Sequence, residues 1–285
     1  MVSLFHRFNN FVQIAPLTLV LAVFLVTPMT IILVVSFYKF TGFLTVPGFV
    51  LENYSRMLGQ VFTYQNYWAT IRITGITWAI TLVLGFTLSY FFVFDIIALR
   101  VKILLFLLAV VPFWTSGVVR MISWLPFLGR EGLINRSIIG MGLTDQPLDF
   151  LLFSEFAVIL SYVHVFTLFM VAPLFNVMAR IDRDLLEAAR DQGASGWQIL
   201  WNIIIPMSRP GIAIGTIFVV ALTATDFTAV RVLSGGKAGT VALTIANQYA
   251  NVQHPFATAN GIVLLLVLLV FVGGLMRLVD VREQL

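Results

Sequence analysis

The chain has 285 residues, of which 60% are hydrophobic and 11% charged, and its formal net charge is +4. Soluble domains carry about a quarter charged residues, so this composition excludes an ordinary soluble protein and indicates a protein embedded in a membrane. The basic residues are dispersed, which argues against a nucleic-acid surface, and the lack of cysteine excludes disulfides, thiolate metal sites and a cysteine nucleophile.

Stretches without charged residues predict the membrane-spanning helices, because about 20 apolar residues cross a bilayer and a charge at its centre is costly. We expect an all-α membrane protein with six transmembrane helices in a single domain, residues 1–285. Their approximate bounds are 14–38, 70–94, 103–125, 156–178, 210–231 and 257–277. The first helix is expected to be retained, since its apolar stretch exceeds a signal-peptide core and no Ala-x-Ala pattern follows.

The distribution of lysine and arginine predicts the orientation. If the N-terminus lies in the cytoplasm, more of these residues fall on the cytoplasmic side, as the positive-inside rule requires. The cytoplasmic set is Arg7, Arg100, Lys102, Arg180, Arg183, Arg190, Arg209, Arg277 and Arg282, and the outside set is Lys39, Arg56, Arg130, Arg136 and Lys237. We therefore expect both termini in the cytoplasm. In the outside loop 126–154, residues Leu133–Met141 predict a short surface helix.

The longest cytoplasmic loop, residues 181–206, is predicted to contain two short helices separated by a turn. Asp182 can cap the first helix, and Gly193 can end it in the left-handed conformation. Ser195 can cap the second helix, which Pro206 is expected to stop.

The second of these helices is amphipathic. Its apolar residues recur at the spacing of one helix face, whereas Gln198 and Asn202 face away. The apolar residues are Trp197, Leu200, Trp201 and Ile204. A short amphipathic helix at a membrane surface suits a groove on a partner protein.

The loop also carries a spaced motif, Glu187-Ala-Ala, Gly193 and Ile203-x-Ile205-Pro206. It resembles the Glu-Ala-Ala signature of permease subunits of binding-protein-dependent ABC importers, with Ile205 in place of leucine. The resemblance implies a type I ABC importer permease fold in which this loop fits a cleft on a separate ATPase. The implied ATPase-coupling residues are Glu187, Ala188, Ala189, Gly193, Trp197, Ile203 and Pro206. The alternative interpretation is an ordinary amphipathic loop on lipid headgroups.

Further motifs are similar to the spermidine/putrescine-type permeases over nearly the whole chain. They are Pro112-Phe-Trp-Thr-Ser-Gly-Val-Val-Arg120, then Gly129, Gly132 and Asn135, and later Thr225-Asp-Phe-Thr and Leu233-Ser-Gly-Gly236. This similarity implies a small polar cargo, such as a polyamine or a related amine, opine or aminophosphonate. Arg231 departs from the pattern, because the polyamine-type permeases have an uncharged residue there. An added cation repels a polyamine, so an anionic or zwitterionic cargo stays open.

The resemblance also implies the partners. A homologous second permease, two ABC ATPase subunits and a periplasmic substrate-binding protein are expected in a bacterial inner membrane, with ATP and Mg bound by the ATPases. The chain has no Gly-x4-Gly-Lys-Ser/Thr phosphate loop, so it is expected to be no enzyme and to bind no cofactor or metal. Leu233-Ser-Gly-Gly-Lys237 resembles an ATPase signature but is interpreted as a glycine turn.

Five residues in or beside the helices are candidates for the translocation path: Arg120, Asp226, Arg231, His164 and Trp114. Arg120 and Asp226 are predicted in the outer third of the membrane, where they can pair across helices or snorkel to the surface. His164 is predicted near the midplane, where transporters place substrate. The alternative for His164 and Trp114 is ordinary packing. Gly211-x3-Gly215 is interpreted as a site of close helix packing.

Two rival functions stay open at this point. An ion-gradient-driven secondary transporter predicts inverted repeats and acidic residues deep in the core, neither of which is clear in the sequence. An intramembrane enzyme requires paired catalytic groups or metal ligands, and His164 and Asp226 alone do not make such a site.

Overall fold

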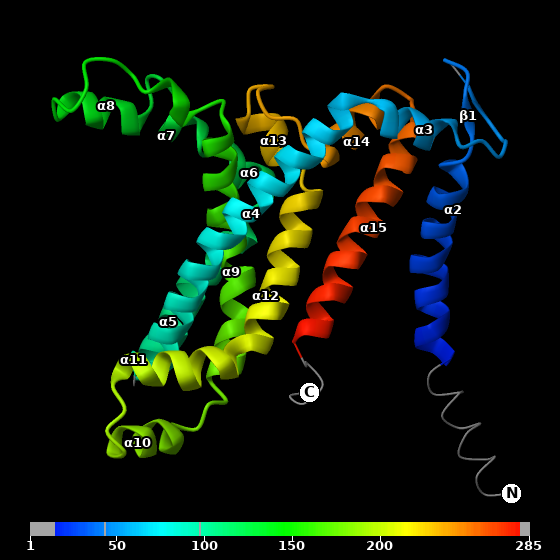
Figure 1. Cartoon of the computed structure of the whole chain (residues 1–285). Helices are drawn as coiled ribbons and strands as arrows, with labels where there is room; N and C mark the ends of the chain where they lie inside the picture. The colour runs from blue at the N-terminus through cyan, green and yellow to red at the C-terminus, as the bar shows by residue number, and fades with distance from the viewer. Residues whose placement is uncertain (1–14, 43, 97, 280–285) are drawn as a thin grey trace, which may run out of the picture. The chain divides into compact units, whose positions relative to one another are not determined.

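The computed structural model describes residues 15–42, 44–96 and 98–279 (Figure 1). Within these ranges, five helices are long and apolar enough to cross a membrane, so the protein is multi-pass. They are Ala15–Val35, Val61–Asp95, Glu155–Met178, Gly196–Thr225 and His254–Leu278. Both termini, Arg7, Arg282 and the predicted first helical residue, Ile14, lie outside the described residues, so the orientation stays a prediction.

The chain divides into two compact units, each described by itself: residues 1–63 with 244–266, and residues 64–243 with 267–285. The first unit contains η1 (Ala22–Val26), α2 (Thr27–Val35) and α3 (Glu52–Gly59), with an antiparallel hairpin of β1 (Lys39–Phe40) and β2 (Thr45–Val46). Asn53 on α3 is buried and donates to the carbonyls of Ser36 and Tyr38 at 2.8 and 2.9 Å. The first helix was predicted to end near residue 38 but ends at Val35. These bonds explain the earlier end, because they hold the carbonyls of Ser36 and Tyr38 outside the helix.

The second unit contains most of the remaining elements. They are α4 (Val61–Tyr90), η2 (Phe91–Asp95), α5 (Leu99–Val110), η3 (Val111–Trp114), α6 (Gly117–Ile122), α7 (Leu125–Leu128), α8 (Leu133–Gly140), η4 (Asp149–Leu151), α9 (Glu155–Met178), α10 (Arg183–Asp191), α11 (Gly196–Ile199), η5 (Leu200–Ile204), α12 (Ile205–Thr225) and α13 (Thr228–Leu233). Three helices cross the boundary between the units: α4, whose first three residues belong to the first unit, α14 (Val241–Ala250) and α15 (His254–Leu278). The predicted second helix, 70–94, corresponds to α4 and η2 and begins earlier, at Val61. The predicted sixth helix, 257–277, corresponds to α15 and also begins earlier, at His254.

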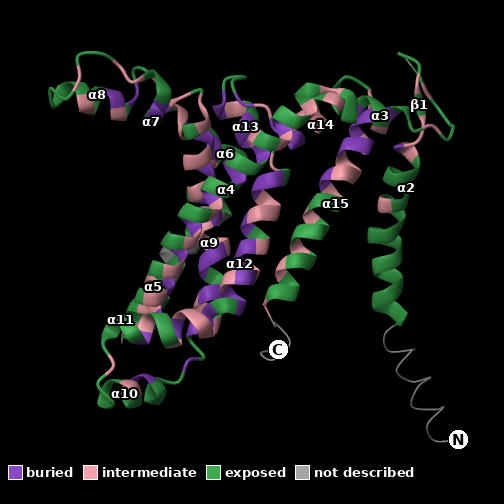
Figure 2. Ribbon diagram, in the orientation of Figure 1, coloured by how far each residue is buried: buried purple, intermediate pink, exposed green. Residues whose placement is uncertain are grey.

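The core of the second unit lies around α9 and α12, on which ten and nine residues are buried (Figure 2). Both helices are tied to α4, since the Trp78 ring nitrogen donates to Thr216 on α12 at 2.9 Å and the Ser89 hydroxyl donates to the Val171 carbonyl on α9 at 3.1 Å. Polar side chains therefore link the three helices inside an apolar region, where hydrogen bonds have no competition from water.

Glycines allow the α9 and α12 backbones to approach closely. A Cβ atom at Gly211 would lie 3.0 Å from the carbonyl oxygen of Pro173, and one at Gly215 would lie 2.5 Å from the sulfur of Met170. The interpretation of Gly211-x3-Gly215 as a close-packing site is confirmed, and no room exists at either position for a side chain.

The predicted third helix, 103–125, is wrong as one continuous helix. The described backbone forms α5, the 3-10 turn η3 and α6 in succession, and Ser116 before α6 is non-helical with ψ 138°. Pro112 lies in the 3-10 turn, and its ring removes the amide that would continue the α-helical bonding. The count of six transmembrane helices therefore stays a prediction.

The predicted fifth helix, 210–231, is also corrected. It starts at Ile205, is continuous with α11 and η5, and ends at Thr225, where Asp226 adopts an extended conformation with ψ 129°. Pro206 was expected to stop the preceding helix but lies inside this continuous helix, directly after the π turn η5, and a local π adjustment is one way in which a helix accommodates a proline. The π turn η5 closes with a hydrogen bond that the Ile205 amide donates to the Leu200 carbonyl, and such a widened turn lets a helix bend without ending.

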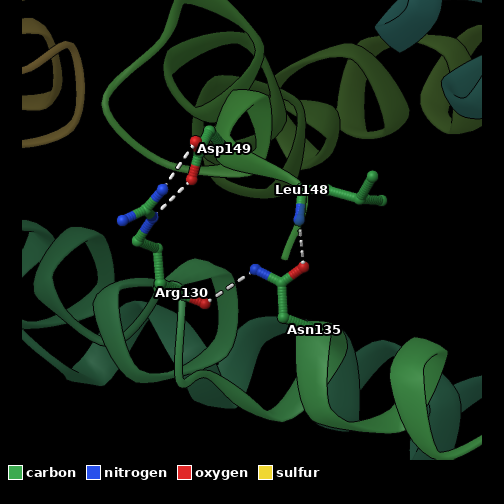
Figure 3. A network of polar contacts seen from close by, with 5 residues as sticks. Arg130, Asn135, Leu148 and Asp149 are labelled. Atoms are coloured by element: carbon green, nitrogen blue, oxygen red, sulfur yellow. Dashed lines mark hydrogen bonds and ion pairs between the residues drawn. The ribbon is translucent and has the colours of Figure 1, made fainter. Parts of the chain in front are cut away.

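The loop of residues 126–154 folds around one buried amide, Asn135 (Figure 3). Its nitrogen donates to the Gly129 carbonyl at 3.0 Å and its oxygen accepts from the Leu148 amide at 2.8 Å. A bidentate ion pair closes the same loop: Nε and Nη2 of Arg130 donate to Oδ1 and Oδ2 of Asp149 at 2.5 and 2.9 Å. The short helix predicted over Leu133–Met141 is confirmed as α8, and Asn135 fixes it to the following turn.

The loop is expected to loosen in acid. The Arg130 hydrogen bond, reinforced by the charges of Arg130 and Lys237, holds the pKa of Asp149 below its ordinary value of 3.8. A carboxyl whose pKa is lowered by folding stabilises the fold above its unfolded pKa, and this contribution is lost as the pH falls through the folded value. Amide hydrogen exchange at Leu148, corrected for intrinsic rates, should therefore be less protected near pH 3 than at about pH 7.

Asp149→Asn should remove most of this pH dependence. Glu131→Gln is the matched control, because Glu131 forms an exposed ion pair with Arg136 at 3.6 Å in the same loop. Equal pH dependence in the Asp149 variant and the parent would contradict the assignment.

Candidate coupling site and translocation-path residues

The first loop helix, α10, has one anchored side and one exposed side. The Asp182 side chain accepts from the Asp184 amide at 3.0 Å, which confirms the predicted cap. Leu186 is 6% exposed and belongs to the core of the second unit, whereas Glu187 and Ala188 are exposed (Figure 2). The fold thus holds α10 in place by Leu186 and presents a carboxylate beside a small side chain.

The end of α10 is closed by a pair of backbone bonds. The Gly193 amide donates to the Arg190 carbonyl at 2.8 Å, and the Ala194 amide donates to the Ala189 carbonyl at 3.0 Å. These two bonds form the Schellman motif, which requires a left-handed residue at the position of Gly193. Gly193 has φ +87°, so the predicted left-handed turn is confirmed.

The second loop helix begins with a capping box. The Gln198 amide donates to the Ser195 hydroxyl at 3.3 Å, and the Ser195 amide donates to the Gln198 side-chain oxygen at 2.8 Å. The cap by Ser195 was predicted, whereas the role of Gln198 was missed. The signal was present, since serine followed three residues later by glutamine is the capping-box pattern.

The predicted apolar stripe of the second helix is wrong in its composition. Ile199 and Ile204 are buried at 4% and 2% exposure, while Trp197 and Trp201 are 68% and 53% exposed and meet edge to face with centroids 5.8 Å apart. The predicted stripe therefore divides: Ile204, which belongs to it, is buried together with Ile199, which was not assigned to it, and the two tryptophans of the stripe are exposed. Two further predicted coupling residues, Ile203 and Pro206, are half-buried.

Within the second unit, α10 and α11 lie at one end of α9 and α12, whereas α6 and α13 lie at the other end (Figure 1). The two groups of candidate residues are therefore separated by the length of the spanning helices. The residues predicted to couple to an ATPase occupy the first end, and Arg120 and Arg231 lie at the second.

Asp226 lies at the break between α12 and α13. Its carboxylate accepts from the Tyr162 hydroxyl at 3.1 Å and from the Ala229 amide at 2.9 Å, so it caps α13. The Tyr162 hydroxyl also lies 3.1 Å from the Asp226 carbonyl, and its ring is 1% exposed. Tyr162 was missed, because nothing in its spacing distinguishes it from a packed aromatic residue. The predicted pairing of Asp226 with Arg120 stays a prediction.

The other path candidates lie in different surroundings. Arg231 is exposed on α13 with its guanidinium carbon 5.0 Å from the Phe227 ring centroid, an arrangement typical of a cation–π contact. His164 is exposed on α9, and its ring lies 5.6 Å from that of Trp124, edge to face. Trp114 is 81% exposed. These residues are accessible in the isolated chain, as residues facing a second subunit or a path would be.

Tyr162→Phe is expected to destabilise the protein by about 1.5–3 kcal/mol, the range for a hydrogen bond to a charged group. The hydroxyl is lost from a buried site, and the capping carboxylate loses a partner. Thermal unfolding of the detergent-purified protein measures the effect. Tyr90→Phe is the matched control, since Tyr90 is half-buried and packs against Phe94 with centroids 5.1 Å apart. Equal melting temperatures for the two variants would contradict the capping role.

The segment resembling an ATPase signature is a turn. Gly235 and Gly236 have φ +59° and +77°, and the Gly236 amide donates to the Ser234 hydroxyl at 3.2 Å. The glycine-turn interpretation is confirmed, and the Leu233 carbonyl before it accepts from the Ser154 amide at 3.1 Å.

A known family matches the part of the chain that contains these elements. The family of binding-protein-dependent transport system inner membrane components matches residues 100–284. The chain belongs to this family. It is a permease of a type I ABC importer, so neither the secondary transporter nor the intramembrane enzyme is retained.

Relatives of this permease agree over most of its length. It is 32% identical over 254 residues to the spermidine/putrescine transport system permease protein PotB of Haemophilus influenzae, covering 87% of each chain. It is 33% identical over 237 residues to PotB of Escherichia coli strain K12, covering 83% of each. The permease is therefore of the spermidine/putrescine-type branch.

Solved structures share the fold. A bacterial ABC transporter involved in the import of the acidic polysaccharide alginate aligns with TM-score 0.77 at 17% identity, covering 97% of the permease and 96% of that chain. The same kind of transporter in complex with an alginate-bound periplasmic protein aligns with TM-score 0.73 at 16% identity. The type I importer permease fold is confirmed.

Proposed function

We propose that this permease forms half of the translocation path of a bacterial inner-membrane importer for polyamines, with a periplasmic protein delivering the cargo and separate ATPases supplying the energy. The named function of the PotB relatives supports the cargo, since they are similar over more than four-fifths of the chain. The other half of the path is a homologous second permease.

The observation that carries the ATP-driven mechanism is the presentation of α10. Its Schellman turn and the buried Leu186 fix it to the spanning helices, while Glu187 and Ala188 are exposed. A small side chain permits close approach of a partner, and the carboxylate offers an ion pair to it. We place two ATPase copies, with ATP and Mg, against this surface and its counterpart on the second permease.

Motion of α10 reaches the membrane through one continuous helix. Residues Gly196–Thr225 run without interruption from the loop into the bilayer, and α10 is joined to them only by the turn at Gly193. Closure of the ATPases around ATP moves α10, and α12 carries this movement to the break at Asp226. Access to the path then alternates between the two sides.

Transport in proteoliposomes tests this proposal. The permease pair, the ATPases and the binding protein are reconstituted, and uptake of labelled spermidine is measured. Uptake should require both the binding protein and ATP. Spermidine uptake driven by an ion gradient alone would overturn the mechanism.

A second cargo class is favoured by one observation. Arg231 is exposed on α13 and held over Phe227, so an additional positive charge stands on the outer side of the predicted path. Such a cation repels a polyamine and attracts an anionic or zwitterionic solute. Calorimetry with the cognate binding protein decides between the classes. Binding of spermidine supports the polyamine, and binding only of an anionic amine compound supports the alternative.

A further inference from the structure

The helix that contains α11, η5 and α12 is longer than a membrane is thick. It runs over 30 residues, Gly196–Thr225, which corresponds to about 45 Å at about 1.5 Å per residue. The hydrocarbon core is about 30 Å thick, so about ten residues at one end lie outside it. The chain changes direction between α11 and α12 (Figure 1), and α12 alone has 21 residues, enough to cross the core, so the excess lies in α11 and η5.

This excess segment has two unlike faces. Ile199 and Ile204 face the protein core, whereas Trp197 and Trp201 project away from it as an exposed, edge-to-face pair. Tryptophan is enriched at membrane–water interfaces, since its ring is apolar and its N–H needs a polar partner. A continuous link to a membrane-spanning helix keeps both rings near that interface.

Charge separates this segment from α10. Asp182 and α10 contain four acidic residues and two arginines; the acidic residues are Asp182, Asp184, Glu187 and Asp191. Residues 196–208 contain no charged side chain, and exposed Arg209 follows them. An anionic bilayer surface repels the acidic helix and attracts an uncharged segment that ends in an arginine. The two halves of the loop are therefore suited to different partners.

We propose that α11 and η5 lie in the headgroup region of the cytoplasmic leaflet, with Trp197 and Trp201 inserted as anchors. The partner of this face is lipid, and the partner of α10 is the ATPase. The proposal rests on the cytoplasmic position of the loop in the proposed function. Anchoring at this point fixes the end of the long helix, so that a push on α10 bends the helix at η5 rather than pulling it out of the membrane.

Spin labels test the proposal in the complete importer. The chain has no cysteine, so single cysteines can be introduced without removing any. Trp201→Cys places a label on the proposed lipid face, and Asn202→Cys places one beside it while leaving both tryptophans intact. Ala188→Cys on α10 is the matched control, because Ala188 is also exposed. The assembly is studied in nanodiscs of phosphatidylethanolamine and phosphatidylglycerol, with and without the ATPase subunits.

The labels at 201 and 202 should collide with a headgroup-attached nickel chelate, and addition of the ATPase should leave this collision rate unchanged. The label at 188 should respond to a water-soluble nickel chelate and lose that response when the ATPase binds. Labels at 201 and 202 that lack lipid contact and become immobilised by the ATPase would overturn the proposal. Lipid contact at 201 and 202 without any ATPase effect at 188 would support the anchor while contradicting the proposed docking on α10.

Discussion

Gly193→Asp is expected to abolish association of the ATPase while the permease stays in the membrane. Gly193 has φ +87°, and an L-residue in the left-handed region costs roughly 1–2 kcal/mol. The strain acts on the Schellman bonds at the end of α10, which set the angle between α10 and the helix that follows the turn. Because a docking surface depends on the angle of this helix, a local change of modest energy is expected to have a large effect on association.

A graded series separates conformation from side-chain size. Gly193→Asn should retain partial association, because asparagine and aspartate both tolerate the left-handed conformation but only aspartate adds a charge to the turn, whereas Gly193→Val should lose association through backbone strain alone. Gly196→Ala is the matched control, because Gly196 has no positive φ and a Cβ atom there meets no atom within 4 Å. Co-purification of the ATPase with the tagged permease is the measurement. Full association of the Gly193→Asp variant would contradict the role of this turn.

Glu187→Lys is also expected to abolish association of the ATPase, in this case through charge repulsion. Reversal of an exposed charge at an interface places like charges together, which costs several kcal/mol and corresponds to roughly a hundredfold or greater loss of affinity. Glu187→Gln should weaken association less, because it removes the attraction without adding repulsion. Unchanged co-purification of the ATPase with Glu187→Lys would show that Glu187 lies outside the interface.

Gly211→Val is expected to prevent accumulation of folded permease. The added Cβ atom would lie 3.0 Å from the Pro173 carbonyl oxygen and 3.1 Å from the Leu174 Cα atom, both in the α9 backbone. Backbone atoms cannot rotate away, so α9 and α12 must separate, and overpacking of this kind costs about 1–3 kcal/mol or more. The separation also breaks the contact on which the core of the second unit depends.

Gly75→Val is the matched control, because Gly75 lies in α4 and a Cβ atom there meets nothing within 4 Å. The fraction of each variant that elutes as a monodisperse peak after detergent extraction, and its melting temperature, are the measurements. Gly211→Val should lose most of the peak, and Gly75→Val should retain it. Equal recovery of both variants would mean that α9 and α12 are less closely packed than the structure indicates.

Local features of the coupling loop could be predicted from the sequence. Asp182, Gly193 and Ser195 act through backbone groups within a few residues, so residue type and spacing are sufficient to assign them. Apolar length is equally local, which is why α9 was predicted at 156–178 and is Glu155–Met178 in the structure. The motif around Glu187 indicates the importer family in the same way, because it consists of residue identities at fixed spacing along the chain.

Other features depend on contacts between distant segments. The Asp226 carboxylate caps α13 and accepts from Tyr162 on α9, which is 64 residues away in the chain, and neither contact was predicted. The third helix is interrupted at Ser116, and the fifth passes through Pro206, because a proline breaks a helix only where its neighbours do not compensate for the lost bond.

The sequence by itself therefore determined that the protein is a multi-pass helical permease and where its coupling loop lies, because apolar length, capping and motif spacing depend on neighbouring residues. Only the tertiary structure decided which residues of that loop are accessible. Leu186, Ile199 and Ile204 face the core, and Glu187, Trp197 and Trp201 do not. This division depends on how the loop packs against the spanning helices, and a widened turn at η5 rotates every residue after it.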